Sequence, residues 1–333
     1  MLSPKQQIRK QQILMASDIN TDAEDLYSLS QVDHEDVQVA VAKNASTTPD
    51  VLMALNKAAY STTVLEAIAL HPHCPTQLFE VLSRNQHIRV RKAVGTARKC
   101  PESILHFLAH DEDIQVISAI AKNPSATPAT LSILAANKSS SLRSSVGANI
   151  SCPIELQKKL ANDDEWWVRH GVAANQSCPP DLLSQLANDS MGTVRYSCAG
   201  NPACPTHILV RFYAEPDKSI RLAVANNAST PVGLVIALAS NDVSEEVRKR
   251  AVEIITTKTA DDWVQAINNG LTLSQACEGS PGLTLGDALL SAGLTDIFQS
   301  IQSTELAFRI EGYSDKANAS LPGPSNAANK LWM

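Results

Sequence analysis

The chain lacks several features that would assign it a function directly. Aromatic residues make up only 4% of its 333 residues, and it has only 13 glycines. No apolar stretch reaches the roughly 18 residues of a membrane span, and the first residues lack the apolar run and cleavage site of a secretory signal. We therefore expect a cytoplasmic protein without membrane contact. Phosphate-binding loops, dinucleotide fingerprints and nucleophile elbows are also missing, so we expect no catalytic residue and no enzyme activity.

The charges leave no footprint of a nucleic-acid-binding domain. The net charge is -6, and the segment from Val37 to Glu253 carries about 21 basic and 19 acidic residues. A near-neutral array does not attract a phosphate backbone through its net charge.

What the chain does have is a proline that returns at a nearly constant spacing, always behind a threonine or a cysteine. Its eight positions are Pro49, Pro75, Pro101, Pro128, Pro153, Pro179, Pro205 and Pro231, with steps of 25 to 27 residues. A fixed period of roughly 20 to 50 residues is the signature of a solenoid.

Each period contains two apolar sets with helical spacing. Before the proline, segments such as VRKAVGTA from Val90 and VRHGVAAN from Val168 place apolar or small residues at i, i+3 and i+4. After it comes a second set, such as Ile104, Leu105 and Leu108. One repeat is therefore two short helices joined by tight turns.

The residues at the turns predict how the helices begin and end. Proline suits the first helical position, so the threonine or cysteine before it is expected to be the N-cap, as at Thr48, Thr127 and Thr230. Asparagines such as Asn44 and Asn175 mark the other turn, where they tolerate left-handed backbone and can close a helix.

The combined pattern, N-P-x-C/T-P-x-x-L-L-x-x-L-A-x-D-x-x-x-V-R-x-A-V-A, resembles the bacterial leucine-rich repeat variant family over about residues 33 to 255. HEAT and armadillo arrays are a looser match. The resemblance implies a right-handed superhelix in which α-helices alternate with shorter, partly 3₁₀ helices. The fold class is thus an all-α, right-handed α-solenoid of eight to nine repeats of ~26 residues, without β-sheet. Some family members hold an iron–sulfur centre on cysteines ahead of the repeats, but residues 1–32 contain no cysteine. We expect no cofactor.

Loss of the period divides the chain into four parts. Residues 1–32 are expected to form an N-terminal helical cap and residues 33–255 the solenoid. Residues 256–311 read as further helices that either cap the last repeat or bind a partner, and residues 312–333 as a disordered tail.

Cysteines and histidines suggest a metal or disulfide site, but their spacing favours structural roles. Adjacent cysteines of the proline motif lie one repeat apart, about 8–10 Å, which is too far for a disulfide or a shared metal ion. The alternative is a set of thiols acidified by helix N-termini. The five cysteines are Cys74, Cys100, Cys152, Cys178 and Cys204. His71 with His73, and His106 with His110, are close in sequence, and turn or capping roles are expected for them. We expect no metal site.

An arginine recurs behind the residue that opens the first helix of most repeats. It stands at Arg91, Arg143, Arg169, Arg195, Arg221 and Arg248, and is replaced by Leu65 and Ile117. One interpretation is a ladder in which each guanidinium pairs with acids such as Asp163, Asp189 or Asp217. The other is a track for phosphates or for an acidic protein.

Specificity is expected where the repeats differ, because the consensus is used for stacking. Trp166 and Trp167 stand where other repeats carry small or polar residues, and tryptophan is enriched at binding hot spots. An alternative is that one tryptophan only fills a gap between repeats. The candidate partner-binding patch is Trp166, Trp167, Arg169, His170, Arg195 and Tyr196.

The function predicted from these features is that of a non-enzymatic scaffold that binds another protein through an extended face. An adaptor, an assembly factor and an inhibitor of a larger complex would all fit. The alternative is a HEAT-like nucleic-acid-binding or DNA-glycosylase-like protein that uses the arginine column with Trp166 and Trp167. The sequence identifies neither the partner nor the oligomeric state.

Overall fold

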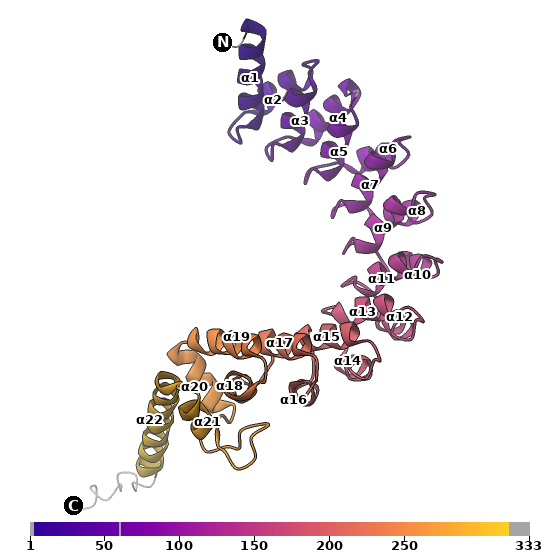
Figure 1. Cartoon of the computed structure of the whole chain (residues 1–333). Coiled ribbons are helices and arrows are strands. Elements are labelled where there is room, and N and C mark those ends of the chain that lie inside the picture. Colours follow the sequence, from indigo (N-terminus) through magenta and orange to yellow (C-terminus); the bar gives the residue numbers. More distant parts are fainter. Residues whose placement is uncertain (1–2, 60, 320–333) are drawn as a thin grey trace, which may run out of the picture. The chain divides into compact units, whose positions relative to one another are not determined.

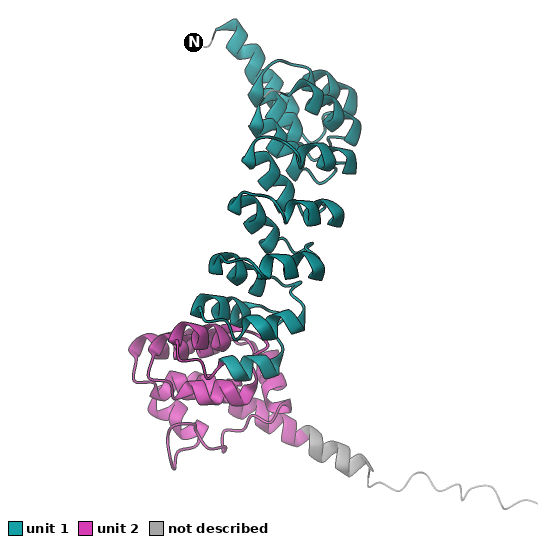
Figure 2. Cartoon of the chain, turned by 90° about the vertical axis from the view of Figure 1, so that its right-hand side faces the viewer, with its two compact units in different colours: residues 1–186 teal, residues 187–333 magenta. Residues whose placement is uncertain are grey.

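The fold consists of short helices that follow one another in pairs. The computed structural model describes residues 3–59 and 61–319, with side chains up to residue 310. Within these residues there are 22 α-helices and no sheet, apart from one isolated bridge between Ala276 and Thr284. Contacts divide the chain into two compact units, residues 1–186 and 187–333 (Figure 2). The predicted all-α helical solenoid is confirmed.

In unit 1, the first helix of each pair is named the A helix and the second the B helix. The A helices pack on one another in chain order, with the B helices beside them (Figure 1). The A helices are α1 (Pro4–Ser17), α3 (Glu35–Lys43), α5 (Thr62–Leu70), α7 (Ile88–Thr96), α9 (Ile114–Lys122), α11 (Ser140–Gly147) and α13 (Trp166–Ala174). The B helices are α2 (Ala23–Ser30), α4 (Pro49–Ala58), α6 (Thr76–Leu82), α8 (Glu102–Leu108), α10 (Pro128–Ala135), α12 (Ile154–Leu160) and α14 (Pro180–Leu186).

Unit 2 continues the same alternation and then departs from it. Its A helices are α15 (Gly192–Gly200), α17 (Lys218–Asn226) and α19 (Glu245–Thr256), and its B helices are α16 (Thr206–Tyr213) and α18 (Val232–Asn241). Three further helices follow, α20 (Ala260–Asn268), α21 (Leu285–Ser291) and α22 (Thr295–Ala319). Helix α21 packs on α18, and α20 packs on α22. Trp263, Leu285 and Ile301 are buried there, so these helices form a closing core.

The two ends can be compared with the expected parts. Helices α1 and α2 pack against α3 and α4 as an A and a B helix do. Helix α22 extends to Ala319, past the predicted start of the tail at residue 312. The rest of that predicted tail, residues 320–333, lies outside the described residues.

The A helices pack closely because the residues between them are small. Val168 and Val172 of α13 are fully buried on one side of the helix. On the neighbouring face, an added Cβ at Gly171 would lie 2.5 Å from the Ser144 carbonyl oxygen of α11. An added Cβ at Gly147 would lie 3.0 Å from a methyl group of Val172. A side chain at either position would therefore push the repeats apart.

The asparagines act differently from the sequence prediction. Asn44 and Asn175 close their helices with φ near -70° and ψ near 120°, which is extended and not left-handed backbone. Their side chains instead reach the preceding repeat. The Asn175 amide donates to the carbonyls of Gly147 and Asn149 at 2.9 and 2.7 Å, and its Oδ1 accepts the amide of Ser177 at 2.9 Å. The prediction of left-handed turns was wrong because the side chain, not the backbone, satisfies this turn.

The same bridge recurs 26 residues apart along the chain. Asn123, Asn149 and Asn227 each donate to two carbonyls of the repeat before them. Asn44 does so to Ala16 and Asp18, which joins α1 to the repeats by the same contact. These asparagines are buried, and an unpaired buried polar group costs about 1–3 kcal/mol. The bridge therefore fixes how one repeat follows another.

His71 takes the place of an asparagine in this series. Its Nδ1 accepts the amide of His73 at 3.0 Å, so its Nε2 carries the proton and donates to the Asn44 carbonyl at 2.9 Å. The neutral imidazole thus reproduces the accepted bond and one of the two donated bonds of the carboxamide. Burial lowers the pKa of His71, and charge repulsion from His73 and Lys99 lowers it further. The hydrogen bond to the Asn44 carbonyl raises the pKa, but by less.

The prolines begin the B helices, but with a different register from the predicted one. Thr48 and Thr127 are N-caps, as predicted, and accept the amides of Val51 and Thr130. At Thr230 the prediction was wrong, because Pro231 is itself the N-cap and the Thr230 hydroxyl donates to the Val224 carbonyl at 2.6 Å.

The cysteines share the position of Thr230, so their predicted role as N-caps was also wrong. Pro75, Pro101, Pro153 and Pro205 are the caps there, and the cysteine before each lies one residue further out. The physical reason is that the cap always stands four residues after the bridging position, whichever residue occupies it.

The B helices are α-helical, and 3₁₀-type hydrogen bonds are found in their first turns. The amide of Leu78 donates to the Pro75 carbonyl and that of Ile104 to the Pro101 carbonyl, both at 3.0 Å. Similar bonds stand at the ends of B helices, such as that from the Arg84 amide to the Val81 carbonyl at 3.2 Å, so in the described residues the 3₁₀ character that the resemblance implies is limited to the first and last turns.

We predict that Gly171→Ala destabilises the protein by roughly 1–3 kcal/mol, because the new methyl group overlaps the backbone of α11. Urea unfolding followed by circular dichroism measures this. The control is Gly200→Ala, where nothing lies within 4 Å of the added carbon and no loss is expected. Equal stability of the two variants would contradict the close packing of α11 and α13.

A second prediction concerns pH. The pKa of His71 is lower in the folded protein than in the unfolded chain, so the unfolded chain binds the proton first as the pH falls. The contribution of His71 to stability is therefore complete above about pH 6.5 and declines below it. His71→Asn should remove this part of the decline, because asparagine makes the same bridge without titrating. Thermal melts of both proteins between pH 8 and 5 test it, and parallel curves would refute it.

Candidate functional site

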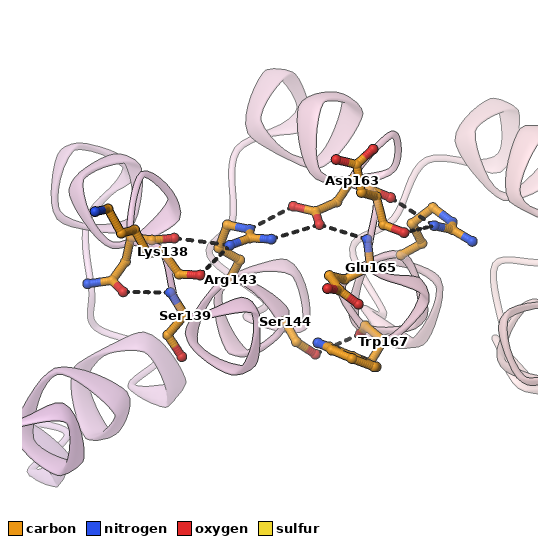
Figure 3. A network of polar contacts seen from close by, with 10 residues as sticks. Lys138, Ser139, Arg143, Ser144, Asp163, Glu165 and Trp167 are labelled. Atoms are coloured by element: carbon orange, nitrogen blue, oxygen red, sulfur yellow. Dashed lines mark hydrogen bonds and ion pairs between the residues drawn. The ribbon is translucent and has the colours of Figure 1, made fainter.

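The arginine column is built into the joints between repeats. In α11, Arg143 donates from Nε and Nη2 to the two carboxylate oxygens of Asp163 at 2.7 and 2.9 Å, and from Nη1 to the carbonyls of Asn137 and Lys138 (Figure 3). Both side chains are largely buried. The bond from Arg143 holds the pKa of Asp163 below its ordinary value. One guanidinium thus ties its own loop to the next repeat.

The same forked pair recurs with different acids. Arg91 pairs with Asp111, Arg195 with Glu215 and Arg221 with Asp242. The ladder interpretation is supported at these positions, and Asp163 is a partner as predicted. Asp217 is not, because it caps α17 by accepting the amide of Ser219. Guanidinium groups engaged in this way do not form a track for phosphates.

The cysteine column is also internal. All seven cysteines are free, and six of them are buried while Cys74 is half-buried. Burial raises the pKa of Cys74, Cys100, Cys152, Cys178 and Cys204 to about 12. Burial argues against the alternative of acidified thiols, because desolvation disfavours the thiolate.

The second histidine pair is a local ring contact. His106 and His110 have ring centroids 5.8 Å apart, and the His106 Nδ1 lies 3.5 Å from the Thr130 hydroxyl. In the part of the chain that the structure describes, no group of three His, Cys, Asp or Glu side chains is placed to hold a metal ion.

Trp166, Trp167 and His170 of α13 form an aromatic cluster. The two indole rings meet edge to face with centroids 5.5 Å apart, and Trp166 lies 6.5 Å from the His170 ring. Trp167 is 36% exposed, and its carbonyl accepts the Ser144 hydroxyl of α11 at 2.8 Å (Figure 3). The cluster therefore rests on the neighbouring A helix and keeps indole surface accessible.

The structure places the other residues of the predicted patch differently. Arg169 shares α13 with the cluster, but its Nη1 donates to the carbonyls of Asp163 and Asp164. Arg195 is held by Glu215. Tyr196 is 46% exposed on α15, in unit 2. The cluster on α13 is thus the part of the patch that the structure brings together.

Sequence reasoning missed two open hollows over the A helices of unit 1. Their volumes are about 470 and 490 Å³. Lys92, Arg98 and Lys122 line the first, and Arg98, Lys122 and His170 line the second. The three basic residues fall at different positions of the repeat, so no column in the sequence groups them.

Comparisons with known proteins add a likeness in fold. No family model and no curated protein matches the chain. A solved leucine-rich repeat variant, described as having a novel repetitive structural motif, is similar over 63% of this chain and 85% of that one, at 21% identity and a TM-score of 0.43. The repeat fold rests on the helix pairs described above. No helix among the described residues is long and apolar enough to cross a membrane.

We predict that Arg143→Ile, which copies the natural Ile117, destabilises the protein by about 1–3 kcal/mol, because Asp163 keeps its burial and loses its charged partner. Arg143→Ile combined with Asp163→Asn should recover part of the loss. Denaturant unfolding of the single variants and the double variant gives the coupling energy. No coupling would show that the pair does not join the repeats.

Proposed function

We propose that the chain is a non-enzymatic, cytoplasmic scaffold that binds another protein through the A-helix face of unit 1. The tryptophan cluster, Trp166, Trp167 and His170, carries this proposal. Trp167 keeps a third of its surface exposed in a chain with four tryptophans. A tryptophan that becomes buried at an interface contributes a large share of the binding free energy, which is lost when the side chain is removed.

The position of the cluster supports a binding role over a purely structural one. A residue that only filled a gap between repeats would be buried, as Val168 and Val172 of the same helix are. Trp166 is half-buried and Trp167 exposed, and both stand at the start of α13 beside a hollow lined by His170. Trp166 anchors the cluster, and Trp167 offers an edge to a partner.

The nucleic-acid alternative finds less support. It requires guanidinium groups that are available to phosphates, whereas Arg91, Arg143, Arg195 and Arg221 each make a forked pair with a carboxylate. Extruded-base chemistry further requires a catalytic group beside the tryptophans, and the hollow next to them is lined by small, basic and apolar residues.

The test is affinity capture from native cytosol with wild-type protein and with Trp166→Ala/Trp167→Ala. We expect a protein bound by the wild type to be lost from the variant, with affinity for the purified partner at least tenfold weaker, as for hot-spot residues. Nuclease treatment of the extract distinguishes a protein partner from one bridged by nucleic acid.

The control variant is Val81→Ala/Ile154→Ala, which removes two exposed apolar side chains from B helices. It should retain the partner. Circular dichroism melts establish that all variants fold. Equal partner recovery by the tryptophan variant and the wild type would refute the patch.

A further inference from the structure

The two hollows over the A helices of unit 1 adjoin each other. The first is lined by residues of α7 and α9, the second by residues of α11 and α13, and Arg98, Lys122 and Pro124 line both. We treat them as one feature, the basic groove, defined by Lys92, Arg98 and Lys122 and by the small residues between them. Each hollow is of the size of an ordinary ligand site.

The charges of this groove are not compensated. No aspartate or glutamate is among its lining residues. Among the described residues, Lys92, Arg98 and Lys122 form no ion pair, in contrast to the forked pairs of Arg91 and Arg143 nearby. Lys122 ends α9, where the helix dipole favours a cation, but Arg98 lies in the turn after α7 and Lys92 in the middle of that helix. Like charges around one concave surface attract an anionic ligand.

Several of the side chains that line the groove are short. Ser118 and Ala119 lie in the first hollow, and Ser145, Ala148 and Ala174 in the second. Short side chains let a polypeptide backbone approach the helices, while the longer basic side chains can reach its carboxylates.

The length of the groove fits a short extended segment. Four A helices, α7 to α13, are separated by three helix spacings of about 8–10 Å each, roughly 24–30 Å in total. An extended chain rises about 3.3 Å per residue, so seven to nine residues cover this distance. His170 lines the end of the groove at α13 and contacts the ring of Trp166.

We propose that the basic groove binds an acidic, extended peptide segment of the partner protein. This inference rests on the proposed function, because it names the chemistry of the segment held beside the tryptophan cluster. Carboxylates on alternate residues of the segment meet Lys92, Arg98 and Lys122. A peptide fits better than a nucleic acid because the cations are three separate points and His170 is the one aromatic side chain among the lining residues, while continuous strand binding uses several aromatic platforms.

The test measures fluorescence anisotropy with a labelled nine-residue peptide of alternating Glu and Ala, the matching Gln and Ala peptide, and a nine-nucleotide single-stranded DNA. The variant Lys92→Gln/Arg98→Gln/Lys122→Gln removes the groove charges. The control Lys57→Gln/Lys138→Gln/Lys159→Gln removes the same charge from exposed positions outside the groove. Circular dichroism melts establish that both variants fold.

We expect the Glu peptide to bind at low salt at least tenfold more tightly than the Gln peptide, to weaken at least tenfold in the groove variant, and to be unchanged in the control. Equal binding of the two peptides overturns the proposal, as does equal weakening in both variants. Tighter, groove-dependent binding of the DNA replaces the peptide with a nucleic acid.

The two proposals can fail separately. A partner lost from the tryptophan variant but unaffected by the groove variant leaves the scaffold function in place and refutes the acidic segment. A Glu peptide bound by the groove, with partner capture unchanged in the tryptophan variant, refutes the tryptophan patch and leaves the groove as the binding site.

Discussion

The structure depends on how the buried turn carbonyls between repeats are satisfied. At most joints between repeats, carbonyls of one turn accept hydrogen bonds from a buried side chain of the next repeat. The carboxamide of asparagine solves this with one side chain, since it donates two hydrogen bonds backward and accepts one from its own turn. This contact joins one repeat to the next at the same position of the period.

The sequence was sufficient for the fold because the repeat presents the same information many times. The apolar spacing predicted both helices of each pair, and the ladder was one of two interpretations of the arginine column, with Asp163 among the acids named for it. Details of the turns were less accessible. Thr48 and Thr230 both precede a proline, yet only Thr48 caps a helix, because the bridging position and not the proline sets the register.

The candidate site was only partly predictable for a related reason. Trp166 and Trp167 stood out as departures from the repeat, but adjacent Arg169 points into the ladder, and sequence proximity could not separate the two. The basic groove was invisible because Lys92, Arg98 and Lys122 belong to a helix centre, a turn and a helix end. They gather only when A helices are placed side by side, a step that depends on three-dimensional packing. In a repeat array, the core is therefore easier to predict from the sequence than the variable surface.

The asparagine bridge also gives the array a direction. In the bridges of Asn44, Asn123, Asn149, Asn175 and Asn227 the donor belongs to the later repeat and the acceptor carbonyls to the earlier one. In such an array, the first repeat has a side-chain amide with no preceding carbonyls to bind, and this amide can rotate toward water. The last repeat has backbone carbonyls with no following amide, and these cannot rotate. An array held by such bridges therefore has chemically different ends, with an unused amide donor at one end and unused carbonyl acceptors at the other.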